Sequence, residues 1–388
     1  MENIIQQFAE NIIPELEVTL EEIYLKNDGG LSKLTRVIKK HIDNLGQAIM
    51  KYTLEELDQA IKESQERKKR WVVQRSSDEK TIITEFGEVK YTRTYYKSKI
   101  DGSYAYLVDK YMGMEPHQRI DKNLESKLID LASNYSYAKS AKLAVKEVQL
   151  SRQTVMNKSR KLERIKYKKQ SEEKKEVAIL YVEADEDHIS LQDGKKTISK
   201  LVYVHEGYEQ GQGRNKLKNV HYFSGIYSNP EDLWLEVADY IEENYDTDKI
   251  KKVFLSGDGA GWIKEGLNWL PKAKYVLDKY HLNKYVLKAT GHVPKLRFEL
   301  WGGINTLDKT KVKRVFKKIM KKTEAESKIK AVRKSRQYIL KNWAGIEAYM
   351  KDKDAIGCSA EGHVSHVLAD RLSSRPRGWS KIGADQMS

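Results

Sequence analysis

A single aspartate stands in a run of glycines directly after a short apolar segment. Residues 250–255 end in Val-Phe-Leu, a pattern typical of a buried strand, and glycines at positions 257, 259 and 261 free the backbone just beyond it. Asp258 lies between the first two of these glycines. In α/β folds ligands bind in the crevice beyond the carboxyl end of a strand, so the pattern predicts that Asp258 binds a cation there.

A second acidic group follows another apolar segment. Residues 177–182 read as a continuous buried strand, and Glu-Ala-Asp-Glu-Asp-His follows at 183–188. Asp185 is the acid that we expect at the end of this strand. Asp187 lies only two residues further on and remains a rival for the same role.

The elements around these acids predict how the two meet. The pattern indicates strands over 177–182, 197–205 and 220–227, a helix from Pro230, strand 250–255, helix 262–269 and strand 273–277. This order matches the α/β ribonuclease-H-like fold, in which three antiparallel strands precede parallel strands added through right-handed crossovers. In that fold the fourth strand lies beside the first, so Asp185 and Asp258 should come together.

Two neighbouring carboxylates raise each other's pKa unless a cation lies between them. Mg²⁺ suits such oxygen ligands, Mn²⁺ is possible, and a two-metal site needs a third acid. Ser359 is predicted to cap a helix that carries Glu361 in its first turn and faces the same crevice. The candidate metal-binding acids are therefore Asp185, with Asp187 as its rival, Asp258 and Glu361.

The charge of the chain points to a polyanionic partner. The formal net charge is +15 and the pI about 9.3. Residues 280–342 carry eighteen Lys/Arg and four Asp/Glu, a net charge of +14, and their pattern is helical. A charge run is usually a solvated face, but this concentration favours contacts with the phosphates of double-stranded DNA. The lysines and arginine selected from its central amphipathic helix are Lys313, Arg314, Lys317, Lys318 and Lys321.

Residues 121–162 contain short helical segments in close succession. Ser151 can cap a helix over 151–162 whose first turns carry residue types that contact bases and phosphates. They are Arg152, Gln153, Asn157 and Lys158. We interpret the region as a helix-turn-helix with 151–162 as its recognition helix; the alternative is an ordinary helical pair with a charged exposed face.

The remaining regions are predicted from their periodicity. Residues 1 to about 70 are helical and suit an assembly or docking domain, whereas 81–84 and 89–96 alternate as a β-hairpin. A charged linker is expected at 166–175. The expected domains are 1–75 (helical), 76–118 (β-hairpin), 119–165 (helix-turn-helix), 176–279 (first part of the core), 280–350 (basic helical insertion) and 351–388 (end of the core with Glu361).

Several classes of protein are excluded by composition. No apolar run approaches the roughly 20 residues of a membrane helix, and the amino terminus lacks the features of a secretion signal. The single cysteine, Cys358, excludes an internal disulfide and a multi-cysteine zinc site. We expect no membrane partner, and a cytoplasmic, nucleoid-associated bacterial protein.

Six short strings together resemble a known family. They are TEFGEV (84–89), YLVD (106–109), PHQRID (116–121), EADEDH (183–188), SGDG (256–259) and SAEGHV (359–364). In combination they resemble the ISLre-type bacterial insertion-sequence transposases, which are DDE enzymes similar to the Mutator group, with many members catalogued only as an uncharacterised protein family.

The resemblance implies metal-dependent nicking of DNA at the ends of an element, followed by transfer of the 3′-hydroxyl strand. By its motifs, the catalytic and metal-binding acids would be Asp185, Asp258 and Glu361. It implies a helical insertion before the catalytic glutamate, a homo-oligomeric synaptic complex, and a structural or DNA-contacting role for His281. Relatives should continue past residues 375–380, and a truncated copy would fold incompletely or be inactive. Two alternatives are a non-catalytic DNA-binding protein and a structure-selective nuclease that does not join strands.

Overall fold

A computed structural model describes residues 2–26, 30–145, 148–162, 173–209, 216–374 and 378–388. The chain divides into two compact units, Met1–Leu162 and Glu163–Ser388. Most of the expected charged linker at 166–175 lies outside the described residues. In the part of the chain that is described, no helix combines the length and apolarity needed to cross a bilayer.

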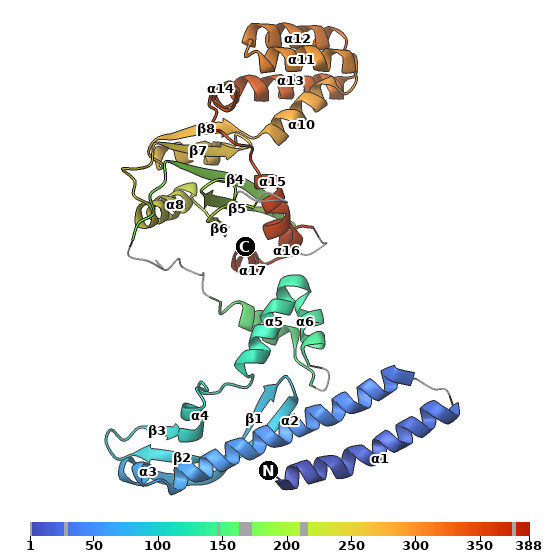
Figure 1. The fold of residues 1–388 in the computed structure, drawn as a ribbon, viewed down its shortest axis with the longest axis vertical. Coiled ribbons are helices and arrows are strands. Elements are labelled where there is room, and N and C mark those ends of the chain that lie inside the picture. Colours follow the sequence, from blue (N-terminus) through green and yellow to red (C-terminus); the bar gives the residue numbers. More distant parts are fainter. Residues whose placement is uncertain (1, 27–29, 146–147, 163–172, 210–215, 375–377) are drawn as a thin grey trace. The chain divides into compact units, whose positions relative to one another are not determined.

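The first unit begins with two long helices that form a hairpin (Figure 1). Their helical structure was predicted from the apolar periodicity. The helices and strands up to residue 111 are α1 (Glu2–Lys26), α2 (Gly30–Glu63), α3 (Gln65–Arg70), β1 (Trp71–Thr84), β2 (Gly87–Ser98), β3 (Tyr104–Tyr106) and α4 (Leu107–Tyr111). The strands form an antiparallel sheet in the order β1-β2-β3. The predicted start of the first strand at Thr81 was wrong, because β1 already pairs with β2 at Trp71, opposite Ser98. Residues 74–79 are polar and mostly exposed, so they lack the alternating apolar pattern of a half-buried strand.

Three short helices complete the first unit. They are α5 (Lys122–Asn134), α6 (Tyr137–Ala144) and α7 (Arg152–Ser159). Leu124 and Leu128 of α5 and Val155 of α7 share one buried core. The predicted cap of the last helix is confirmed, since the Ser151 hydroxyl accepts a hydrogen bond of 3.1 Å from the Thr154 N–H.

The second unit contains a five-stranded mixed sheet (Figure 1). Its strands are β4 (Ile179–Ser190), β5 (Lys196–His205), β6 (His221–Gly225), β7 (Lys252–Gly257) and β8 (Ala273–Leu277). The order is β6-β5-β4-β7-β8, with antiparallel pairing from β4 to β6 and parallel pairing of β4, β7 and β8. The expected neighbourhood of the first and fourth strands is therefore confirmed.

Opposite faces of this sheet are covered by different helices, because successive side chains of a strand point to opposite sides. Leu180 and Val182 of β4 pack against Trp234 of α8 (Pro230–Asn244). Leu201 and Tyr203 of β5 pack with the C-terminal segments. The remaining helices of these two layers are α9 (Gly261–Glu265), the short 3₁₀ turn Gly266–Asn268, α15 (Ala360–His363), the π-helical turn Val364–Ala369, α16 (Asp370–Leu372) and α17 (Lys381–Met387).

The basic region 280–350 is a helical insertion between β8 and α15, as predicted. Its helices are α10 (Lys279–Thr290), α11 (Pro294–Asn305), α12 (Lys309–Lys321), α13 (Glu326–Lys341) and α14 (Trp343–Lys351). They enclose a core of their own, which includes Val286, Leu300, Phe316 and Ile339. The insertion is thus a folded layer that adjoins the sheet at β8.

Candidate active site

The register of two parallel strands places the two predicted aspartates side by side. Ala184 of β4 pairs with Gly257, the last residue of β7. Asp185 and Asp258 directly follow these two residues, so both lie where the parallel pairing of β4 with β7 stops. The expectation that the first strand ends before Asp185 was wrong: β4 continues to Ser190, because the residues from Asp185 onward pair with β5.

The loop that carries Asp258 is held in one conformation. Gly259 has a φ of +90°, and a Cβ atom at this position would lie 2.6 Å from Oδ1 of Asn342. The Asp258 carboxylate accepts a hydrogen bond of 2.8 Å from the Ala260 N–H. The backbone carbonyl of Asp258 accepts one of 2.5 Å from the Tyr338 hydroxyl of α13. The insertion therefore contacts the backbone of this acid directly.

Asp185 is buried, with 8% of its surface exposed. Burial raises the pKa of this carboxyl to about 6, and the negative charges of Asp258 and Glu361 add to the shift. A hydrogen bond of 2.8 Å from the Glu186 N–H and the charge of His281 oppose it. Asp185, Asp258, Glu361 and His281 are therefore close enough to influence one another electrostatically.

His281, in the first turn of α10, connects this group to a buried acid. Asp278 caps α10 and accepts a hydrogen bond of 2.8 Å from Nδ1 of His281, while Nε2 of the same ring lies 3.8 Å from a Glu361 oxygen. Burial lowers the pKa of His281, but the hydrogen bond and charge of Asp278, together with the charges of Asp185 and Asp258, outweigh it, so the pKa is raised overall. The resemblance implied a structural or DNA-contacting role for this histidine, and the structure places it beside the acids.

Glu361 lies in the first turn of the four-residue helix α15, as predicted, with about half of its side chain (49%) exposed. The predicted cap by the Ser359 side chain was wrong, because that hydroxyl makes no capping bond. It donates instead to the Glu183 carboxylate at 3.1 Å, and its oxygen lies 2.8 Å from the Tyr203 hydroxyl oxygen. Two buried partners thus compete successfully with the helix terminus.

Asp187, the rival of Asp185, has a different environment. Its carboxylate accepts a hydrogen bond of 2.8 Å from the Ser373 hydroxyl, beyond the end of α16. Its other oxygen is buried and has no hydrogen-bond partner among the described residues. The Asp187 carboxylate is thus engaged by the C-terminal segment next to α16.

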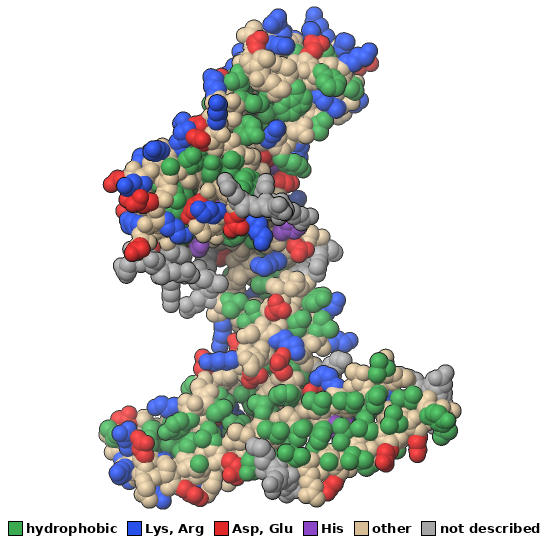
Figure 2. All heavy atoms as spheres, in the orientation of Figure 1, with side chains coloured by type: hydrophobic (Ala, Val, Ile, Leu, Met, Phe, Trp, Pro, Cys, Tyr) green, Lys and Arg blue, Asp and Glu red, His purple; other side chains and the backbone are tan. Residues whose placement is uncertain are grey.

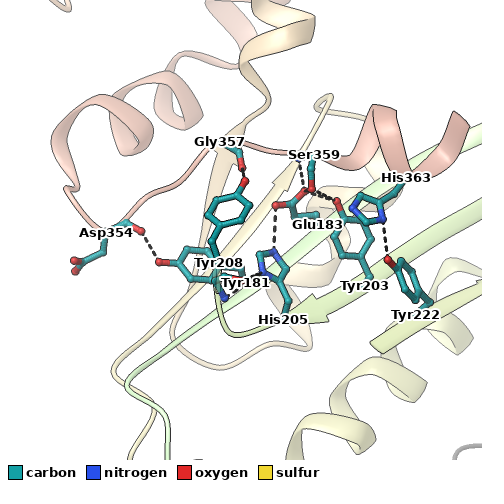
Figure 3. Close-up of polar contacts among 11 residues, drawn as sticks. Tyr181, Glu183, Tyr203, His205, Tyr208, Tyr222, Asp354, Gly357, Ser359 and His363 are labelled. Atoms are coloured by element: carbon teal, nitrogen blue, oxygen red, sulfur yellow. Dashed lines mark hydrogen bonds and ion pairs between the residues drawn. The ribbon is translucent and has the colours of Figure 1, made fainter. Parts of the chain in front are cut away.

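A buried polar network next to the acids was not predicted from the sequence. Glu183, Tyr203 and His205 lie between the sheet and the segment that leads to α15 (Figure 3). One signal could have identified Glu183: it precedes Asp185 by two residues in a strand, so both side chains point to the same face. A carboxylate at a core position of an otherwise apolar strand needs buried partners.

The three acids match a metal site in their chemistry but not in their present spacing. Among the described residues, no three His, Cys, Asp or Glu side chains already stand at the spacing of metal ligands. The donor chemistry nevertheless fits a hard divalent cation, because the group consists of carboxylate oxygens. The raised pKa of Asp185 comes mainly from burial, and the charges of Asp258 and Glu361 add to it. Glu361, half-exposed and within 3.8 Å of His281, would have to turn toward the aspartates.

The helix predicted to contact DNA in the first unit is exposed on one side. Arg152, Gln153 and Asn157 of α7 are exposed, and the Gln153 amide donates a hydrogen bond of 3.0 Å to the Asn157 side chain. Lys158 is partly buried in an ion pair of 2.6 Å with Glu125 of α5. Three of the four predicted contact residues thus face solvent, and the fourth ties α7 to α5.

The amphipathic pattern of α12 is confirmed. Val312, Val315, Phe316 and Ile319 enter the core of the insertion, whereas the five basic residues selected from the sequence are all exposed. Those five are Lys313, Arg314, Lys317, Lys318 and Lys321. Lys318 pairs with Glu299 of α11 at 2.6 Å. Figure 2 shows Lys and Arg side chains along the outer surface of the insertion helices.

Comparison with known proteins places the chain in a family. It belongs to the uncharacterised protein family UPF0236, whose family model matches residues 24–388. A UPF0236 protein of Caldanaerobacter subterraneus subsp. tengcongensis is 48% identical over 387 residues, which cover 100% of this chain and 82% of that protein. Another from the same organism, whose name joins eleven locus designations, is 47% identical over 387 residues, covering 100% of this chain and 82% of its own.

A more distant relative extends the comparison to a second organism. The UPF0236 protein in the vanSb 3′ region of Streptococcus gallolyticus is 26% identical over 317 residues, which cover 78% of this chain and 69% of that protein.

Proposed function

We propose that this protein is a DDE-type transposase that nicks double-stranded DNA at the ends of an insertion sequence and transfers the 3′-hydroxyl strand to a target. The observation that carries the proposal is the register of β4 and β7, which sets Asp185 beside Asp258 with Glu361 and His281 in electrostatic reach. The strand order, with three antiparallel strands followed by two parallel ones, supports a ribonuclease-H-like core.

The proposed cation ligands are Asp185, Asp258 and Glu361, with Mg²⁺ as the natural occupant and Mn²⁺ as a substitute. Bound there, two such ions would supply activation of the attacking oxygen and stabilisation of the leaving 3′ oxygen. The protein's own contribution is orientation: Tyr338 holds the backbone of Asp258, and Asp278 holds the ring of His281. That ring stands beside the proposed third ligand.

DNA binding is assigned to two basic surfaces. The exposed lysines and arginine of α12 offer a sequence-independent contact with phosphates, and the exposed residues of α7 offer contacts with base edges. Both fit a protein that recognises a defined end and holds a long polyanion. A homo-oligomeric complex that pairs two ends, in the bacterial nucleoid, follows from the same proposal.

The names of the relatives favour a mobile element over a housekeeping nuclease. One relative has a name that joins eleven locus designations from a single organism. Repeated loci for one protein are what copying of a transposable element produces. The ISLre-type motif strings point in the same direction.

The test is a cleavage and joining assay on a duplex that carries the element's end, with Mg²⁺ present. Asp258→Ala should abolish nicking and joining while binding to the end is retained, because the substituted group lies in a short, partly exposed loop. Asp187→Asn is the matched control and should retain both steps. Loss of DNA binding in Asp258→Ala would contradict a catalytic role.

Two alternative functions correspond to other outcomes of the same assay. Nicks without joined product would identify a structure-selective nuclease. Specific binding without any cleavage would identify a DNA-binding protein that has lost catalysis. The second alternative is favoured by one observation, that no three potential ligands within the described ranges stand ready at metal-binding distances.

A further inference from the structure

A buried carboxylate two residues before Asp185 joins the sheet to the segment that carries Glu361 (Figure 3). Glu183 is 1% exposed. One of its oxygens accepts hydrogen bonds from the Ser359 N–H at 2.6 Å, the Ser359 hydroxyl at 3.1 Å and the Tyr203 hydroxyl at 2.5 Å. The other oxygen lies 3.2 Å from Nε2 of His205. A single side chain of β4 therefore ties β5 to the start of α15.

Other side chains of the sheet and its connections grip the same segment at successive points. The Tyr181 hydroxyl donates to the Asp354 carbonyl at 2.8 Å, and the Tyr208 hydroxyl donates to the Gly357 carbonyl at 3.3 Å. Further along, the Tyr222 hydroxyl lies 2.8 Å from Nδ1 of His363. Figure 3 shows these contacts as a row that follows the chain from Asp354 to His363.

The charge state of Glu183 is consistent with these contacts. Burial alone would raise the pKa of this carboxyl, but hydrogen bonds from His205 and Tyr203 outweigh burial and lower it. A buried carboxylate is costly unless several donors satisfy it. The donors belong to β5 (Tyr203 and His205) and to the start of α15 (Ser359). Their hydrogen bonds to Glu183 therefore hold the segment before α15 against the sheet.

Asp185 and Glu361 each lie two residues beyond a member of the Glu183–Ser359 contact. Glu183 and Asp185 share one face of β4, and Ser359 and Glu361 lie two residues apart at the start of α15. The same two pieces of backbone thus carry the Glu183–Ser359 contact and the Asp185–Glu361 pair. The first contact is a built hydrogen-bonded joint, and the second consists of like charges that repel each other.

We propose that Glu183 is a positioning residue that fixes the entry of α15 and thereby brings Glu361 to Asp185 and Asp258. The joint is needed because the insertion separates β8 from α15, so the chain returns to the sheet without a neighbouring strand to place it. This inference rests on the proposed function for its catalytic consequence. Its structural content, that Glu183 anchors Ser359 at the entry of α15, can be tested without any catalysis.

The single cysteine provides the structural test. Cys358 lies between two anchored residues, its side chain is partly buried, and burial raises the pKa of its thiol, so labelling by Ellman's reagent at pH 8 should be slow. Glu183→Gln in the full-length protein should accelerate labelling at least about tenfold, because the amide offers only one acceptor oxygen to the donors and the segment opens more often.

Two further variants keep the test decisive if Glu183→Gln folds poorly. Ser359→Ala removes the hydroxyl contacts but retains the N–H, so it should accelerate labelling by a smaller factor than Glu183→Gln does. Ser359→Thr keeps both groups and should label at the wild-type rate. Val237→Ala is the matched control for reduced stability, since this fully buried residue of α8 packs on the opposite face of the sheet. Equal acceleration in Val237→Ala and Glu183→Gln would overturn the proposal.

The catalytic consequence is measured on the same variants. Glu183→Gln should reduce the nicking rate at saturating DNA by at least about tenfold, with DNA affinity unchanged and Val237→Ala close to wild type. Unchanged labelling in both Glu183→Gln and Ser359→Ala would refute the anchoring role. A wild-type protein that never nicks, combined with accelerated labelling of the variants, would refute the proposed function and support the anchoring role alone.

Discussion

Replacing the buried acid Asp185 by asparagine should stabilise the cation-free protein at neutral pH. Burial and the charges of Asp258 and Glu361 raise the pKa of this carboxyl to about 6, so the fold favours its protonated form. The stability that this protonation provides is complete below about pH 4, the pKa in the unfolded chain, and is lost as the pH rises through about 6. Above that range the wild-type protein carries a buried charge that the asparagine variant lacks.

The size of the effect follows from the shift. About two pKa units correspond to about 3 kcal/mol, which is an upper limit because neighbouring groups relax. For a unit of roughly 150–250 residues, 1 kcal/mol changes the melting temperature by about 2–4 °C. Asp185→Asn should therefore melt up to about 6–12 °C higher than wild type at pH 8, and the difference should disappear near pH 4. The Glu186 N–H can still donate to the asparagine oxygen.

The assay is thermal unfolding in EDTA between pH 4 and pH 8, repeated with Mg²⁺. Wild type should gain about 1.4 kcal/mol at a Mg²⁺ concentration ten times its Kd, whereas Asp185→Asn should gain much less. Asp187→Asn is the control and should keep the Mg²⁺ response. The reasoning is refuted if Asp185→Asn melts at or below the wild-type temperature at pH 8, or if Mg²⁺ stabilises both proteins equally.

Three other predictions follow from the same structure. Gly259→Ala should destabilise the protein by about 1–3 kcal/mol in urea unfolding, because the new Cβ meets a side-chain oxygen at 2.6 Å and φ is +90°; a change below about 0.5 kcal/mol would contradict this. Tyr338→Phe should slow nicking severalfold and cost about 1 kcal/mol, with DNA affinity intact, since it removes a hydrogen bond to the Asp258 carbonyl. Replacing Lys313, Lys317 and Lys321 by alanine should lower the slope of log affinity against log salt concentration by about 0.9 for each phosphate that the variant no longer neutralises, and an unchanged slope would exclude α12 from the interface.

Local sequence patterns determined much of the architecture. Three predicted features depend on neighbouring residues and are present in the structure: the cap at Ser151, the amphipathic stripe of α12, and the order of strands and helices in the second unit. Asp258 could also be selected as a candidate site residue from the local sequence, because it follows an apolar strand directly and has glycine on both sides.

Only the tertiary structure decided which side chains stand around the acids. Ser359 looked like a helix cap from its position, but the buried carboxylate of Glu183 is a stronger partner for its hydroxyl than the helix terminus. The sequence pattern could not choose between Asp185 and Asp187, because both side chains point to the same face of β4. Which of them lies next to the end of β7 depends on the register of β4 with β7, which is set by strand pairing.

The sequence by itself therefore determined the elements and the types of group available for chemistry. The fold decided three other features: the return of the chain after the insertion, the contact of Tyr338 with the Asp258 loop, and the position of His281 beside Glu361. The physical reason is range: caps and periodicity act between residues a few positions apart, whereas the Glu183–Ser359 joint connects groups 176 positions apart that meet only once the sheet has formed.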